Sequence, residues 1–316
     1  MSENHPHSHF GELAIKATNR LALSLAFTLA FVVVELVAGF ISNSLALLTD
    51  AAHNFTDVIA LGLSWYALRI ALQPANARRT YGYHRVGILV ALVNSTTLVL
   101  ISLGIFYEAY RRFLSPPRVD APILIGVGII AFFVNAGTAW LVHRGSEHDL
   151  NLRSTFLHLM GDVLSTLGAV AAGITIVFTG WNWLDPLVSV LIGFLILWNA
   201  WGILRQTIHI LLESTPQNID VDKLLTDLRN VDGVLDVHDL HVWSISENLR
   251  VLSAHIVTPD TSISTGSVIQ RNLNRVLAHK YDIQHATLQL ECEGCESNLL
   301  YCDIGETSHV HERISV

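Results

Sequence analysis

LLTDAAHNFTDVIALGL, residues 47–63, is an apolar stretch that carries a histidine and an aspartate four positions apart, His53 and Asp57. Residues at this spacing lie on one face of a helix, about one turn apart. The stretch therefore predicts an apolar helix with an imidazole and a carboxylate on the same face.

The same spacing returns in STFLHLMGDVLSTLGAV, residues 154–170, where His158 and Asp162 are again four positions apart. Face to face, two such helices would offer two nitrogen and two oxygen ligands, a set that suits tetrahedral zinc. The alternative is two unrelated polar pairs that cap or pack helices.

The composition indicates a membrane protein with a polar part attached. Of the 316 residues, 51% are hydrophobic and only 15% are charged, whereas a soluble domain carries about 25% charged residues. An Asp at the centre of a bilayer costs at least ~2.5 kcal/mol, so ionisable groups there are functional by default. The repeated pairs therefore predict a metal site inside the membrane. A net charge of -8 gives no indication of nucleic-acid binding.

Six apolar segments are long enough to cross a hydrocarbon core of ~30 Å, which predicts a mainly α membrane protein with six transmembrane helices. They are Leu21–Phe40, Ala46–Leu72, Val86–Tyr110, Ala121–Val142, Thr155–Thr179 and Pro186–Leu211.

Basic residues near the predicted spans gather on one side of the membrane. That side has Lys16, Arg20, Arg69, Arg78, Arg79, Arg85, Arg144, Arg153 and Arg205, and the other has Arg111, Arg112 and Arg118. Positive residues stay inside, so we expect both termini to be cytoplasmic. Short loops and compact length favour a bacterial inner membrane.

The composition changes after Glu213, where helical and strand patterns alternate in the order α-β-β-α-β. This order predicts a small cytoplasmic α+β domain that resembles a ferredoxin-like fold without its first strand. The expected organisation is a His-containing cytoplasmic N-terminal tail over 1–17, the transport domain over 18–212, the cytoplasmic domain over 213–292 and a flexible tail over 293–316.

Together these patterns resemble the cation diffusion facilitator family of metal transporters. The resemblance runs from about Leu21 to Cys295. It is carried by SNSLALLTDAAHNFTD, YGYHRVGILVALVN, HLMGDVLSTLG, LLESTP and HDLHVWSI.

The resemblance implies a homodimer that moves zinc out of the cytosol in exchange for protons. The implied transport site consists of His53, Asp57, His158 and Asp162. Imidazole ligands favour zinc over manganese, with cadmium, cobalt or nickel as further substrates. Histidine titrates near ~6.5 when unperturbed, so protons and metal compete for such a site.

The resemblance also points to a second metal site in the cytoplasmic domain, at His238, His255 and the region from His285 to Glu291. Side chains alternate along a strand, so we expect His238 and His241 to face opposite sides. The alternative is a set of surface histidines. The resemblance further implies a charge lock between Arg85 and Glu213 at the cytoplasmic end of the spans.

Cys292 and Cys295 form a CxxC pair that supplies half of a tetrahedral zinc site. The remaining ligands could come from the N-terminal tail, through His5, His7 and His9. The alternative is a free cysteine pair on a loose tail. Three cysteines in total, with Cys302 unassigned, argue against a disulfide framework.

Asp50 lies three residues before His53, on much the same helix face. It is a candidate fifth ligand, a charge on the access path or a hydrogen-bond partner for a ligand histidine, and its position favours the last. For Glu35, in the first span, interhelical hydrogen bonding is the favoured role.

Two other functional classes would use the same membrane site. An intramembrane metalloenzyme keeps an open zinc position beside a general base, but the spans contain no HExxH motif and no nucleophile motif. A membrane metal sensor needs an output module, and no kinase, cyclase or DNA-reading pattern follows the spans.

Overall fold

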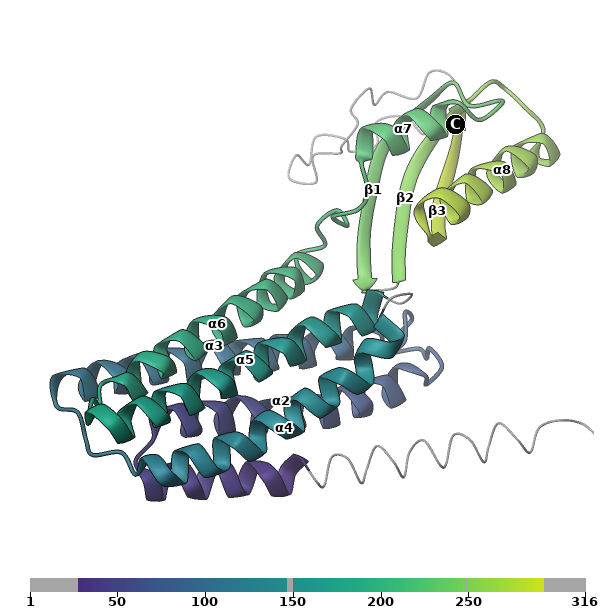
Figure 1. Cartoon of the computed structure of the whole chain (residues 1–316). Helices are drawn as coiled ribbons and strands as arrows, with labels where there is room; N and C mark the ends of the chain where they lie inside the picture. Colours follow the sequence, from purple (N-terminus) through teal and green to yellow (C-terminus); the bar gives the residue numbers. More distant parts are fainter. Residues whose placement is uncertain (1–27, 147–149, 248, 293–316) are drawn as a thin grey trace, which may run out of the picture. The chain divides into compact units, whose positions relative to one another are not determined.

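The computed structural model describes residues 28–146, 150–247 and 249–292 (Figure 1). Its N-terminal part consists of helices at the positions of the predicted spans. They are an unlabelled helix at Thr28–Ser42, α2 (Leu45–Ala71), α3 (Arg85–Leu114), α4 (Ala121–Ser146), α5 (Leu150–Thr179) and α6 (Leu184–Leu211).

Within the described residues, four helices have the length and apolar composition to cross a membrane. These are α3, α4, α5 and α6. Helix α2 is 27 residues long but carries Asp50, His53, Asn54 and Asp57, which lower its hydropathy. The chain is thus a membrane protein, and the total of six spans remains a prediction.

By their contacts the residues form two compact units. One comprises the described parts of 1–67 and 90–204, and the other those of 68–89 and 205–316. The second unit therefore includes the ends of α2 and α6 and the start of α3. The domain boundary expected after residue 212 stays a prediction.

Helices α4 and α5 approach each other closely at two glycines. A Cβ on Gly128 would lie 2.8 Å from Cγ2 of Val170, and one on Gly173 would lie 2.9 Å from Cγ1 of Ile125. Small residues let helix backbones meet at such short range. This contact holds α5, which carries the second His–Asp pair.

The start of α2 is fixed by Asp185, a residue of the first turn of α6 with no exposed surface. Its carboxylate accepts hydrogen bonds from the backbone nitrogens of Leu45, at 2.6 Å, and Ala46, at 3.2 Å, and from Ser44 Oγ, at 2.6 Å. The first N–H groups of a helix have no partner within the helix and favour a negative charge. Asp185 therefore caps α2 from another helix.

The C-terminal part confirms the predicted order α-β-β-α-β. It consists of α7 (Val221–Arg229), β1 (Asp236–Ser246), β2 (Leu249–Thr258), α8 (Ile263–Tyr281) and β3 (Ile283–Cys292). The strand order is β1-β2-β3, with β1 antiparallel and β3 parallel to β2.

Helices α7 and α8 cover the same face of this sheet, because both contribute to a single apolar core with all three strands. Asp227 joins the two helices through Lys280 Nζ, at 2.9 Å, and the hydroxyl of Tyr281, at 2.7 Å. The Lys280 ammonium lowers the pKa of Asp227, and burial together with Asp227 raises the pKa of Tyr281. The apolar core of this part thus lies between the sheet and these two helices.

Candidate metal-transport site

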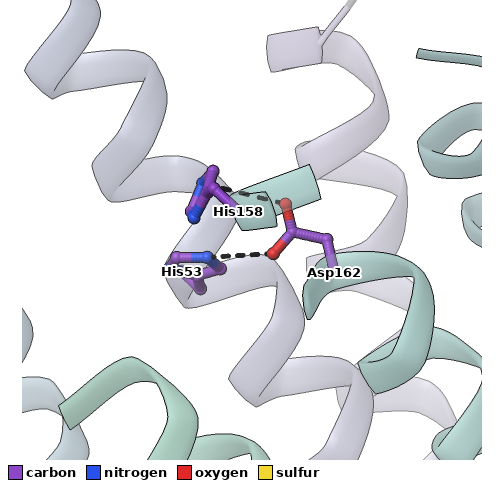
Figure 2. Close-up of side chains that lie close together, drawn as sticks. All are labelled: His53, His158 and Asp162. Atoms are coloured by element: carbon purple, nitrogen blue, oxygen red, sulfur yellow. Dashed lines mark ion pairs between the residues drawn. The ribbon is translucent and has the colours of Figure 1, made fainter. Parts of the chain in front are cut away.

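Helices α2 and α5 bring the two His–Asp pairs together, and each imidazole lies against the carboxylate of the other pair. His53 Nε2 is 3.3 Å from Asp162 Oδ1 (Figure 2). His158 Nε2 is 3.2 Å from Asp57 Oδ2. Within the pairs the corresponding distances are 3.6 Å for His53–Asp57 and 3.8 Å for His158–Asp162. All four side chains thus meet at one place.

The spacing of these atoms is suited to a metal ion. Zinc ligands at bond lengths near 2.0–2.1 Å in a tetrahedron stand roughly 3.3 Å from one another. The ligand atoms of His53, His158 and Asp162 all lie within 4.8 Å of one another. Asp57 is outside this group of three, although its carboxylate contacts both histidines, so the four-ligand N₂O₂ set stays a prediction.

The group is buried on one side and open on the other. The side chains of His53 and Asp162 are 9% and 13% exposed, whereas those of His158 and Asp57 are 39% and 36% exposed. An ion could therefore reach the group past His158 and Asp57 and be held against His53 and Asp162.

Asp50 does not make the hydrogen bond expected of it. It is 4% exposed, yet its Oδ2 has no hydrogen-bond partner in the described chain, and neither has Nδ1 of His53. Its carboxyl group instead lies within hydrogen-bonding reach of Glu35. The favoured role of orienting a ligand histidine is therefore wrong in this structure, because Asp50 faces the neighbouring helix.

A second cluster lies on the face of the C-terminal sheet opposite α7 and α8. Glu291 of β3 contacts His238 Nε2 of β1 at 3.2 Å and His255 Nδ1 of β2 at 2.8 Å. The two imidazole rings are 5.2 Å apart, and His238 is only 4% exposed. Two nitrogens and a carboxylate can hold a metal ion there.

His238 and His241 share a face of the sheet, so the expectation that they face opposite sides is wrong. His238 pairs with His255 and His241 with Ser253, so three steps along β1 match two along β2. Such a β-bulge inserts one residue and shifts the alternation. Asp239, with φ of 49°, lies at the bulge, and its carboxylate contacts His241 at 2.9 Å and His255 at 3.5 Å.

His285 is not brought to this cluster. It lies six positions before Glu291 on β3, which corresponds to roughly 20 Å of strand. Its ring instead contacts Tyr81 at 5.7 Å. Grouping it with His238 and His255 is therefore wrong, because strand position separates them.

The thiol candidates are only partly within the described residues. Cys292 is free and exposed at the end of β3. Cys295, His5, His7 and His9 lie outside the described residues.

Two family models match the chain in succession. The cation efflux transmembrane domain matches residues 21–212, and the cytoplasmic domain of cation efflux proteins matches residues 216–293. The chain belongs to the cation diffusion facilitator family of cation efflux transporters.

Curated relatives of this cation efflux protein are similar over nearly their whole length. A cadmium, cobalt and zinc/H(+)-K(+) antiporter of Bacillus subtilis is 39% identical over 88% of this chain and 91% of the relative. The zinc transporter ZitB of Pectobacterium atrosepticum is 37% identical over 98% and 94%. The metal cation efflux system protein CzcD of Cupriavidus metallidurans is 35% identical over 94% and 92%.

A solved metal-bound C-terminal domain of the Cupriavidus metallidurans CzcD transporter is 32% identical. It covers 23% of this chain and 99% of its own length, with a TM-score of 0.22. The curated relatives are transporters, so this cation efflux protein is a metal transporter and not an enzyme.

The expected ion pair between Arg85 and Glu213 is present, with Nη2 and Oε1 2.7 Å apart. The two side chains are 43% and 58% exposed, and exposed pairs contribute only ~0–1 kcal/mol. The pair therefore contributes little to stability, and its role as a charge lock stays a prediction.

Asp185 and Asp239 are the residues near the two sites that sequence reasoning missed. Ser44, a typical N-cap residue directly before α2, signalled a helix start, but nothing local signalled that a carboxylate from α6 would cap it. Asp239 lies between the two histidines of the cytoplasmic strand, and the period-2 pattern concealed the bulge.

Proposed function

We propose that this cation efflux protein exports Zn²⁺ from the cytosol in exchange for protons, with Cd²⁺, Co²⁺ and Ni²⁺ as further substrates. The main support is the crossed arrangement of the two His–Asp pairs: His53 of α2 lies against Asp162 of α5, and His158 of α5 lies against Asp57 of α2. Neither helix alone offers four ligands, so the site exists only while α2 and α5 keep this register.

The same four side chains can carry both ions. Zinc sheds its water to enter and is held by neutral imidazoles and carboxylates, whereas the protonated forms do not bind it. A site that opens in turn to the two sides of the membrane would therefore take zinc from the cytosol and return with protons.

The donor set also supports the choice of metal. Imidazole is a borderline ligand that suits zinc, whereas oxygen-only sites suit manganese and magnesium. Two of the four ligands here are imidazoles, one buried and one half-exposed. The names of the relatives, which include zinc, cadmium and cobalt, agree with this choice.

The proposal extends to the assembly of the protein. Six spans, both termini in the cytoplasm of a bacterial cell and a homodimer are consistent with the transmembrane and cytoplasmic family models. Within this arrangement the C-terminal sheet would lie in the cytosol, where it can sense the metal that is to be exported.

Zinc flux in proteoliposomes tests the transport site through Asp162→Asn. The substitution keeps the shape of the side chain but removes the charge that faces His53, so we expect flux to fall to the protein-free background. Asp120→Asn is the matched control, because Asp120 is an exposed residue at the start of α4 and Asn also caps helices. Full zinc flux in the Asp162 variant would reject the assignment.

We further propose that His238, His255 and Glu291 bind zinc in the cytoplasmic domain, with the CxxC pair as an additional ligand source. Glu291→Gln should lower the number of zinc ions bound per chain in equilibrium dialysis of the full-length protein. His285→Ala should leave it unchanged, because His285 is on the same strand but far from the cluster. Equal losses in both variants would contradict this site.

A further inference from the structure

Glu35 and Asp50 form an acid pair inside the helical part that the transport site does not use. Glu35 has no exposed surface and Asp50 is 4% exposed. One oxygen of each, Glu35 Oε1 and Asp50 Oδ2, has no hydrogen-bond partner in the described chain. The other Glu35 oxygen, Oε2, accepts a hydrogen bond from Asn54 Nδ2 at 3.2 Å.

The two carboxyl groups come from different helices and are close enough to hydrogen-bond each other. Two carboxylates can do so only if one of them is protonated, because an ionised carboxylate offers acceptors alone. Two buried like charges side by side cannot both stay ionised. A single proton between Glu35 and Asp50 would therefore satisfy both oxygens that lack a partner.

The charged groups around the acid pair belong to the transport site. His53, one turn further along α2, interacts electrostatically with Asp50. Asp162 of α5 interacts electrostatically with both carboxyl groups. Within the part of the chain that the structure describes, no Lys or Arg is among the charged groups that interact with the pair. A divalent ion at the transport site would repel a proton on the acid pair, and departure of the ion would favour its return.

From this geometry we infer that Glu35 and Asp50 together bind one proton whose release is coupled to metal binding at the neighbouring site. The inference rests on the proposed function and deepens it, because one of the protons exchanged for zinc is then held by residues that do not bind the metal. Glu35 is the proton-holding residue and Asp50 its acceptor, while Asn54 positions Glu35.

A proton fits the pair better than a larger monovalent cation. K⁺ is bound by several oxygens that replace its hydration shell. Here the third neighbour, Asn54, directs an N–H donor at Glu35, which would repel a cation. Glu35 is also fully buried, so a hydrated ion has no open path to its carboxyl group.

Proton release on zinc binding tests the inference without transport. Full-length protein in detergent is titrated with ZnCl₂ in a weakly buffered solution containing a pH dye. Glu35→Gln should release about one proton fewer per zinc bound than the wild type, and Asp50→Asn should behave alike. The double variant should lose no more than either single variant, because the proton is shared.

Several outcomes overturn the inference. Unchanged proton release in Glu35→Gln, with zinc still bound, means that the pair holds no exchangeable proton. Additive losses in the double variant mean two independent protons. If Glu35→Gln fails to fold, Asp50→Asn and the conservative Glu35→Asp test the inference instead. Glu35→Asp keeps a carboxyl group and should release as many protons per zinc as the wild type. Asp120→Asn is the matched control and should match the wild type.

A second measurement separates this inference from the proposed function. In proteoliposomes with the membrane potential clamped, the imposed pH gradient sets the final ratio of zinc concentrations on the two sides of the membrane. Each coupled proton changes this ratio about tenfold for every pH unit of the gradient. Glu35→Gln should lower this ratio about tenfold while zinc is still moved. A wild type with no dependence on pH would reject the antiport itself. A Glu35→Gln effect that requires K⁺ and leaves the proton count intact would assign the pair to K⁺ and overturn the inference.

Discussion

The two histidines of the transport site differ in their surroundings although they occupy equivalent positions in the repeated pattern. His53 is buried, and its Nδ1 has no hydrogen-bond partner among the described residues, whereas His158 is half-exposed beside Asp57. A buried ligand has less freedom to be replaced by water. His53 is therefore the residue at which a change of ligand type should most affect metal preference.

His53→Asp replaces a nitrogen ligand with an oxygen ligand and makes the set harder. We expect weaker discrimination for zinc and better transport of manganese, because oxygen ligands suit harder ions. A competition assay in proteoliposomes that compares zinc and manganese flux measures the change. Retention of the wild-type preference would mean that His53 does not touch the ion.

At the scale of elements, the transport site depends on where α2 begins. Asp185 holds three donors at that point and is approached by Arg112 Nη1 at 3.9 Å, which itself bonds to the carbonyl of Asn43 at 2.6 Å. The first turn of α2 is therefore tied to both α3 and α6. His53 lies only two turns further along, so its position is set by this anchor.

Asp185→Ala should destabilise the protein, because Ser44 and two helix N–H groups lose their acceptor. The expected loss is about 1–3 kcal/mol, visible as a lower thermal unfolding midpoint and weaker zinc binding. Ser189→Ala is the matched control: Ser189 is equally buried on α6, but its hydroxyl bonds only to the carbonyl of Asp185. Equal midpoints for the two variants would show that Asp185 does not anchor α2.

At the scale of the whole molecule, the sequence predicted what depends on regular repeats. The four-residue spacing predicted which side chains of α2 and α5 share a face, and the pairs do meet. The strand and helix periods predicted the order of the C-terminal elements. These features follow from local geometry and need no knowledge of distant contacts.

Features that depend on irregular backbone or on remote segments were not predictable. The bulge at Asp239 places His241 on the same face of the sheet as His238. No glycine in the strand marks this bulge in the sequence. The contact of Asp185 with α2 joins helices distant in sequence, and that of Glu35 with Asp50 depends on how two consecutive helices pack. The number of spans stays a prediction because only four described helices are long and apolar enough to cross a membrane, and the tail ligands stay one because they lie outside the described residues.

The coupling of zinc to protons is the central claim, and two dyes in one proteoliposome assay test it. A zinc dye on one side and a pH dye on the other report both fluxes at once. We predict zinc and proton movements in opposite directions, each able to drive the other, because the ligands bind zinc only when they are deprotonated. Zinc flux that ignores an imposed pH gradient and proceeds with no proton counterflow would contradict the account and indicate a passive channel.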